Sequence, residues 1–291
     1  MARASERSLS VEEIHLALLQ AIPDGMCFMD LNGSVRFWND AAETVSGFSI
    51  AEAVCAPRGE DVLFITDSDG RRVNPHLVVA GAVDGKPGIH FLRHKDGHHL
   101  PILLRRVAVR TRNHEPMGVL SLFARSESYS SQAEPRNHSA GQWPDPGSHP
   151  AAILVIQIDN FERTSLQLGP EAAEKLFLLV EQTTTGCLKD DDWCGRVRDG
   201  VLLASIMTAS PQYMLELAER LRVLIQSSRI QWWGEEVQIT ASIGAALMHP
   251  HDAIADATAR AEDCALRAKQ GGGNQVLLSS CSSSSGTPSQ L

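Results

Sequence analysis

Apolar runs and amphipathic segments alternate through the second half of the chain. The run 151–159 is short, branched and almost wholly apolar, which predicts a strand buried on both faces. Three later segments repeat apolar residues at three- and four-residue spacings, which predicts amphipathic helices. These helices are expected at 170–188, 211–226 and 252–270.

Extended segments separate these helices. Asp199-Gly200 is a strong hairpin signal inside 195–206, because glycine accepts positive φ freely. Further strands are expected at 237–247 and 275–278, the latter after three consecutive glycines. The order is βαββαβ with one extra helix and strand, so we expect an α+β sheet covered by helices on one face.

The first half begins with a capped helix. Ser10 and Glu13 form a capping box before a helix expected at 11–22. Its apolar stripe contains Ile14 and Leu18, and is interpreted most simply as core, although an amphipathic helix of this kind can also dimerise.

Short strands and tight turns follow this helix. Asn32-Gly33 and Asp96-Gly97 each predict a hairpin turn between two strands. Two short helical pieces hinged at Gly47 are expected at 41–52, and a closing strand is expected at 118–123.

Composition divides the chain into two domains of ordinary size with loose segments around them. A chain of 291 residues suits two domains that each bury a core. The segment 126–150 is rich in Ser, Pro, Gly and Asn and lacks periodicity, which predicts a flexible linker. We expect a leader at 1–10, a first domain at 11–125, a second domain at 151–279 and a disordered tail at 280–291.

Charge and hydropathy restrict the class of protein. The formal net charge of −9 is spread without a basic stripe, which disfavours nucleic acid as a partner. No run of eighteen apolar residues and no secretory hydrophobic core occur, so we expect a cytoplasmic protein without a membrane partner. The six cysteines show no CxxC spacing, which predicts buried free thiols.

Two C-terminal segments carry a resemblance to a known family. The segments 239–245 and 260–274 resemble the C-terminal half of a GGDEF domain, the diguanylate cyclase family. The run ending at Phe161, together with Gly169, resembles that family's first strand and its Asp-x-Asp-x-Phe motif. The resemblance covers about 151–278 and implies the βαββαβ fold of that family. Its members join two GTP molecules into cyclic di-GMP, using divalent cations held by carboxylates.

The resemblance also shows where acidic side chains are missing. It places the first metal aspartate at Gln157, two residues before Asp159. The Gly-Gly-Asp/Glu-Glu-Phe hairpin falls on 198–202, so the metal-binding acid becomes Gly200. A slip of one residue would place Asp199 there but would leave Gln157 unchanged. We therefore expect a degenerate domain with no catalytic residues, no bound metal and no enzymatic activity.

Other site positions are partly kept. The resemblance aligns the guanine-contacting asparagine with Ser165 and a phosphate-binding arginine with Gly273. Glu174 occupies a second guanine-contacting position and can still accept from a guanine edge, and Lys269 could still meet a phosphate. These two are candidates for residual nucleotide binding.

A further candidate lies just before the hairpin. The family's product-binding Arg-x-x-Asp motif aligns with Lys189 and Asp192. Lysine keeps the charge but loses the planar two-pronged geometry of arginine. A solvated acidic turn is the favoured interpretation, with residual nucleotide binding as the alternative.

The first half resembles a PAS domain over about 18–124. The residues that carry this resemblance are Pro23-Asp24-Gly25, Asp30 with Gly33, Asn39, Gly47-Phe48-Ser49 with Glu52, and Lys95-Asp96-Gly97. It implies a sensor with a five-stranded antiparallel sheet, short helices, and a cavity for haem, flavin or a small metabolite; many such domains dimerise. His76 is the candidate haem ligand, although a surface histidine is the commoner explanation.

Three other histidines cluster beside the Asp96-Gly97 turn. His94, His98 and His99 could be mistaken for metal ligands. Because neighbouring strand residues alternate faces, we interpret them as an exposed loop.

Three functions follow from the sequence. The favoured one is a signalling protein in which a PAS sensor is joined to a catalytically inactive cyclase-like domain that acts through protein or nucleotide contacts. The alternatives are an active diguanylate cyclase and a receptor for GTP or cyclic di-GMP. The expected partners are a second copy, through the PAS domain, and a protein of cyclic di-GMP signalling.

Overall fold

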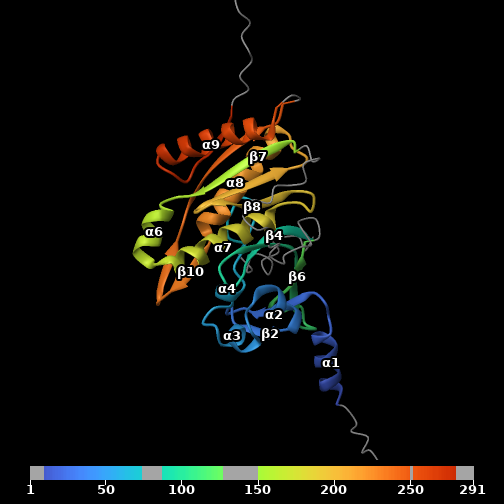
Figure 1. Ribbon diagram of the computed structural model, residues 1–291. Coiled ribbons are helices and arrows are strands. Elements are labelled where there is room, and N and C mark those ends of the chain that lie inside the picture. The colour runs from blue at the N-terminus through green and yellow to red at the C-terminus, as the bar shows by residue number, and fades with distance from the viewer. Residues whose placement is uncertain (1–9, 74–86, 127–149, 250–251, 280–291) are drawn as a thin grey trace, which may run out of the picture. The chain divides into compact units, whose positions relative to one another are not determined.

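The structure of the chain is a computed structural model that describes residues 10–73, 87–126, 150–249 and 252–279 (Figure 1). The chain divides into two compact units, Met1–Ser131 and Gln132–Leu291. Most of the expected leader, linker and tail lies outside the described residues, as does His76.

An antiparallel sheet forms the first unit. Its strands are β1 (Gly25–Asp30), β2 (Val35–Trp38), β3 (Ile65–Thr66), β4 (Gly88–Arg93), β5 (His99–Arg110) and β6 (Pro116–Arg125). They lie in the order β2-β1-β6-β5-β4-β3. The antiparallel sheet is confirmed, and the two-residue strand β3 adds a sixth strand to the five expected.

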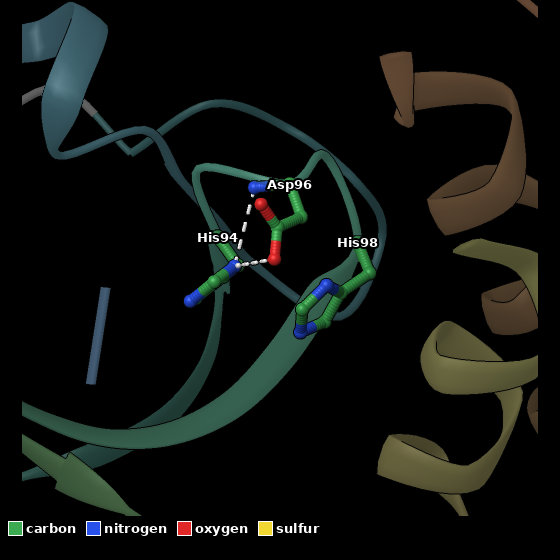
Figure 2. Close-up of side chains that lie close together, drawn as sticks. All are labelled: His94, Asp96 and His98. Atoms are coloured by element: carbon green, nitrogen blue, oxygen red, sulfur yellow. Dashed lines mark hydrogen bonds and ion pairs between the residues drawn. The ribbon is translucent and has the colours of Figure 1, made fainter. Parts of the chain in front are cut away.

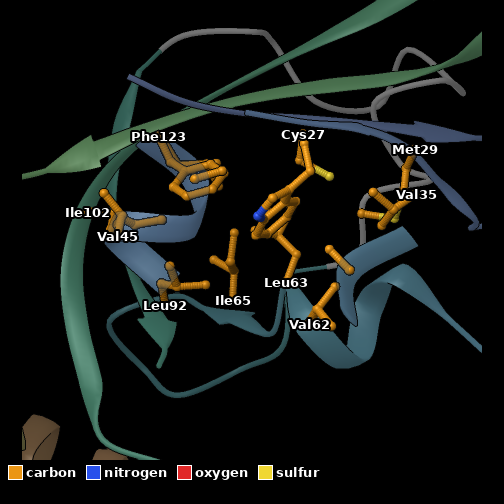
Figure 3. Close-up of a cluster of buried hydrophobic side chains, with 14 residues drawn as sticks. Cys27, Met29, Val35, Val45, Val62, Leu63, Ile65, Leu92, Ile102 and Phe123 are labelled. Carbon is orange, nitrogen blue, oxygen red and sulfur yellow. The ribbon is translucent and has the colours of Figure 1, made fainter. Parts of the chain in front are cut away.

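Short helices cover this sheet and enclose one core (Figure 3). The helices are α2 (Asp40–Ser46), α3 (Ile50–Cys55) and α4 (Gly59–Val62), and α2 ends at Gly47 with φ 77°. The buried Asn39 joins α2 to the sheet, because its Oδ1 accepts from the amides of Met26 at 2.7 Å and Ala42 at 2.9 Å. The hinge expected at Gly47 is confirmed.

The N-terminal helix α1 (Val11–Gln20) has the predicted capping box but buries none of its residues. Ile14 is 42% exposed and Leu18 is 62% exposed. The interpretation of its apolar stripe as core is therefore wrong, because nothing among the described residues covers that stripe.

A five-stranded sheet forms the second unit. Its strands are β7 (Ala152–Ile158), β8 (Trp193–Arg198), β9 (Val201–Ile206), β12 (Ala241–Leu247) and β13 (Val276–Leu278), in the order β13-β12-β7-β9-β8. Only the β12–β13 pair is parallel among these neighbours. The predicted central strand is confirmed, since nearly every residue of β7 is buried.

The strand expected at 237–247 is divided in two. Residues of β11 (Glu235–Gln238) pair with β10 (Arg229–Trp232) in a separate hairpin, and β12 begins at Ala241. Trp233 and Gly234 both have positive φ, which closes the turn of that hairpin.

Helices lie on both faces of this sheet. They are α6 (Phe161–Leu168), α7 (Pro170–Cys187), α8 (Pro211–Ser227) and α9 (Ile254–Gln270). Ile153 and Val155 pack with α9, whereas the intervening Leu154 and Ile156 are equally buried on the face of α7 and α8. The prediction of helices on one face is wrong, because a strand that is apolar at every position must be covered on both sides.

Helix α9 contacts the sheet directly at Gly244. A Cβ at Gly244 would lie 2.0 Å from the carbonyl oxygen of Ala261 and 2.3 Å from the amide nitrogen of Ala265.

Every helix among the described residues falls short of the length and hydrophobicity needed to cross a bilayer.

Substituting Gly244→Ala is expected to destabilise the second unit by about 3 kcal/mol, because overpacking against backbone forces α9 away from the sheet. Urea denaturation followed by circular dichroism would measure the change. Gly271→Ala is the matched control, because a Cβ there would lie no closer than 3.2 Å to any neighbouring atom, whereas one at Gly244 would lie 2.0 Å from backbone. An equal loss of stability in both variants would contradict the proposed contact.

Candidate functional site

Several predicted site positions meet at one end of β7. Gln157 is paired with Val201, just past the hairpin turn, and with Ser242 on β12. The amide of Ile158 donates to the carbonyl oxygen of Gly200 at 2.8 Å. A Cβ at Gly273 would lie 3.0 Å from the carboxylate of Asp159, which places the glycine turn at the same end of the strand.

Asp159 is a buried structural carboxylate. Its Oδ2 accepts from Thr240 Oγ1 at 2.7 Å and from the amide of Asn274 at 2.8 Å. Its Oδ1 accepts from Ser242 Oγ at 2.7 Å. Three donors hold this carboxylate, so it joins β7 to the start of β12 and to the glycine turn.

Two arginines fix the hairpin to opposite layers. Arg196 Nη1 contacts Glu174 Oε2 of α7 at 2.8 Å, and its guanidinium lies 4.0 Å from the centre of the Phe177 ring. Arg198 Nη1 contacts Glu262 Oε1 of α9 at 2.8 Å. Residues two apart on a regular strand share a face, but a bulge between Arg196 and Arg198 sends them to opposite sides.

The Arg196 pair occupies a position expected to meet guanine. Burial alone would lower the pKa of Arg196, but the hydrogen bonds and charges of Glu174 and Asp199 raise it above its usual value. Glu174 therefore already accepts from an arginine. Sequence reasoning missed both arginines, and their two-residue spacing before an Asp-Gly turn was the only available signal.

The glycine turn after α9 uses its own amides. The amides of Gly271, Gly272 and Gly273 donate to carbonyl oxygens in the last turn of α9. Gly272 and Gly273 have φ values of 120° and 75°, which favour glycine. These amides therefore do not form a free cradle for phosphate.

Two other predicted positions lie near this end of the unit without joining the cluster. Lys269 is half-buried in the last turn of α9, where its carbonyl oxygen accepts from the amide of Gly272 at 3.3 Å. Its ammonium makes no hydrogen bond or ion pair with the described residues. Ser165 lies on α6, where its carbonyl oxygen accepts from Gly169 at 3.0 Å. Its side chain makes no hydrogen bond to the other predicted positions that the structure describes.

The side chains at the strand end do not fit the divalent cations that the GGDEF resemblance implies. Gln157 offers a neutral amide, Gly200 offers no side chain, and three donors already hold Asp159. Asp199 is 86% exposed and pairs with Arg196. Within the described ranges, the only cluster of three or more potential metal ligands lies in the first unit.

The turn before the hairpin is built on a buried aspartate. Asp192 Oδ2 accepts from the amide of Lys189 at 3.0 Å, and its Oδ1 accepts from the amide of Met207 at 2.9 Å. The Lys189 ammonium lies 4.8 Å from the centre of the Tyr213 ring. The interpretation of a solvated acidic turn is wrong for Asp192, because that residue is buried and connects the turn to the end of β9.

The histidines of the first unit are not an exposed loop. His98 is 7% exposed and His99 is fully buried. The β4–β5 turn packs on the end of α2, since the amide of Lys95 donates to the carbonyl oxygen of Ser46 at 2.9 Å. Burial lowers the pKa of His94, and burial with the nearby charge of His94 lowers the pKa of His98 to about 4.

Both halves of the chain match known families. Residues 16–125 match the family model of the PAS fold. Residues 137–275 match the family model described as "Diguanylate cyclase, GGDEF domain". Both resemblances seen in the sequence are confirmed.

Curated relatives match a part of the chain. Diguanylate cyclase DosC of Escherichia coli (strain K12) is 25% identical over 130 residues, which is 44% of this chain and 28% of that protein. Diguanylate cyclase A of Treponema denticola is 25% identical over 129 residues, which is 44% of this chain and 35% of that protein. The chain therefore matches about a third or less of the length of these relatives.

Solved structures match a similar share of the chain. The active GGEEF domain of a diguanylate cyclase from Vibrio cholerae is 22% identical, with a TM-score of 0.42, and the match covers 45% of this chain and 84% of that one. The GGDEF domain of FimX from Pseudomonas aeruginosa is 22% identical, with a TM-score of 0.40, over 44% of this chain and 79% of that one.

These relatives correct one expectation from the sequence. The prediction that the chain is not an enzyme is contradicted, because the curated relatives named above are diguanylate cyclases. The replacements at Gln157 and Gly200 change two side chains of the site, and two such changes do not show that the domain is inactive. The chain carries a PAS domain followed by a GGDEF domain and is related to the diguanylate cyclases.

Proposed function

We propose that the GGDEF domain binds a guanine nucleotide, GTP or cyclic di-GMP, and that the PAS domain controls this binding. The partly exposed ion pair between Glu174 and Arg196 carries the proposal. It places an acceptor for the N–H groups of a guanine edge beside a cation that can contact phosphate.

Binding is an exchange of partners in this proposal. A guanine edge would replace Arg196 as the donor to Glu174. Arg196 would keep its contact with Asp199 at 3.1 Å and its position over the Phe177 ring, and would turn its freed N–H groups to phosphate.

A second candidate is synthesis of cyclic di-GMP from GTP. The curated relatives favour it, since both named above are diguanylate cyclases. Asp199 lies at the hairpin turn, and its carboxylate faces solvent. The bulge gives β8 one extra residue, and a shift of one residue in the alignment would place Asp199 at the position of the family's metal-binding acid.

Helix α1 supports self-association through the first unit. A ten-residue helix that buries none of its residues is marginally stable alone in water. Its exposed apolar residues, among them Leu18, would be covered by the same stripe of a second copy.

Glu174→Gln is expected to weaken GTP binding about tenfold and to reduce the preference for GTP over ATP, because a charged acceptor for the guanine edge is lost. Calorimetry on the full chain with GTP, cyclic di-GMP and ATP would measure both changes. Glu171→Gln is the control, as it removes the same charge from an exposed position on α7. The absence of binding of either guanine nucleotide to the unmodified chain at millimolar concentration would contradict the proposal.

If the second candidate holds, incubation with GTP and Mg²⁺ yields cyclic di-GMP, and Asp199→Asn lowers the yield to the level without protein. Mass analysis of the product measures both. Asp191→Asn is the control at an exposed position of the same unit. Undiminished product from the Asp199→Asn variant would rule out a role for this carboxylate, and product absent from the unmodified chain would rule out turnover.

Leu18→Glu is expected to convert a dimer into a monomer, because a charge in the covered stripe would lose its hydration. Light scattering after size-exclusion chromatography measures the mass. Glu12→Gln changes the charge at an exposed position on the other side of the same helix and should leave the dimer intact. A monomeric mass for the unmodified chain would contradict the proposed contact.

A further inference from the structure

Two histidines and an aspartate gather at the β4–β5 turn of the first unit (Figure 2). His94, Asp96 and His98 each offer one ligand atom, and these atoms all lie within 4.8 Å of one another. We propose that these three residues bind a divalent transition-metal cation of the zinc class.

The turn itself brings the two rings together. The amide of His94 donates to the carbonyl oxygen of His98 at 2.8 Å, and the amide of Gly97 donates to the carbonyl oxygen of His94 at 2.8 Å. Gly97 has φ 96°, which permits this tight closure. Opposite residues of a hairpin point to the same side, so the two rings stack with centres 4.6 Å apart.

The arrangement of acceptors favours a cation. The amide of Asp96 donates to His94 Nδ1 at 3.2 Å, so the lone pair of Nδ1 points toward Asp96. The carboxylate oxygen Oδ2 of Asp96 lies 3.3 Å from the same nitrogen. Either a proton on Nδ1 or a cation between the two atoms would turn this contact into an attractive one, and a metal ion bound there could take the place of the proton.

His98 adds a buried nitrogen without a partner. His98 is 7% exposed, and its Nδ1 makes no hydrogen bond with any described residue. Figure 2 shows a ring nitrogen of His98 facing the Asp96 carboxylate. Coordination would satisfy a buried polar atom that the fold leaves unpaired.

The ligand set selects the class of cation. Two imidazoles and one carboxylate suit Zn²⁺, Ni²⁺ and Cu²⁺ better than Mg²⁺ or Ca²⁺. Ligand atoms around a tetrahedral zinc lie about 3.4 Å apart. The Asp96 side chain is 73% exposed and free to swing inward to that spacing. Lys95 lies between two of the ligands in sequence, and its positive charge would repel a bound cation. Its ammonium instead contacts Glu52 at 2.5 Å.

Cobalt provides a spectroscopic test on the full chain, prepared without a histidine tag and stripped with a chelator. Co²⁺ is expected to produce visible absorption bands that equimolar Zn²⁺ removes. Asp96→Asn should weaken Zn²⁺ binding at least tenfold, and His98→Gln should weaken it more, because loss of a ligand exceeds the about 10–100-fold effect of losing an outer partner.

His90→Gln is the matched control, because His90 lies on β4 and its Nδ1 contacts the carbonyl oxygen of Gly88 at 3.0 Å instead. Asp96→Asn keeps the test decisive if His98→Gln fails to fold, since Asp96 is exposed. Unchanged affinity in the Asp96→Asn variant would overturn the proposal and place any bound metal elsewhere. Absence of cobalt bands together with zinc binding weaker than millimolar would also overturn it.

Discussion

The buried carboxylate of Asp159 is the interaction on which the second unit's site depends. A charge removed from water is costly unless donors replace the lost hydration. Thr240, Ser242 and Asn274 supply those donors and come from two segments far along the chain. The end of β7, the start of β12 and the glycine turn are thereby fixed to one another. The same contact accounts for the break between β11 and β12, since the amide of Asp159 also donates to the carbonyl oxygen of Thr240.

Local chemistry was sufficient to predict much of the fold. The turns at Gly33, Gly97 and Gly200 all have positive φ, as an Asn-Gly or Asp-Gly pair predicts. The helices α7, α8 and α9 begin and end within two residues of the expected bounds, because their apolar periodicity and flanking residues are local signals. Both domain resemblances also depended on such short motifs, and both are confirmed.

Contacts between distant residues could not be predicted in this way. Asp159 and Asn274 are 115 residues apart, and Arg198 and Glu262 are 64 apart. The burial of His98 likewise depends on where the β4–β5 turn packs, which alternation along a strand does not determine. The activity of the domain could not be predicted either. The substitutions at Gln157 and Gly200 say nothing about which residues the other side chains of the site contact. Arg196 shows this directly, since its contact with Glu174 changes what that glutamate offers a ligand.

The two arginines of the hairpin have a mechanical consequence. Arg196 holds one side of β8 to α7, while Arg198 holds the other side to α9. A ligand that drew Glu174 away from Arg196 would loosen the hairpin's contact with one layer only, since Arg196 would keep its place over the Phe177 ring of α7. The turn of the β8–β9 hairpin would then rotate about the Arg198–Glu262 contact. Binding of a ligand on the α7 side would thereby tilt the hairpin toward α9.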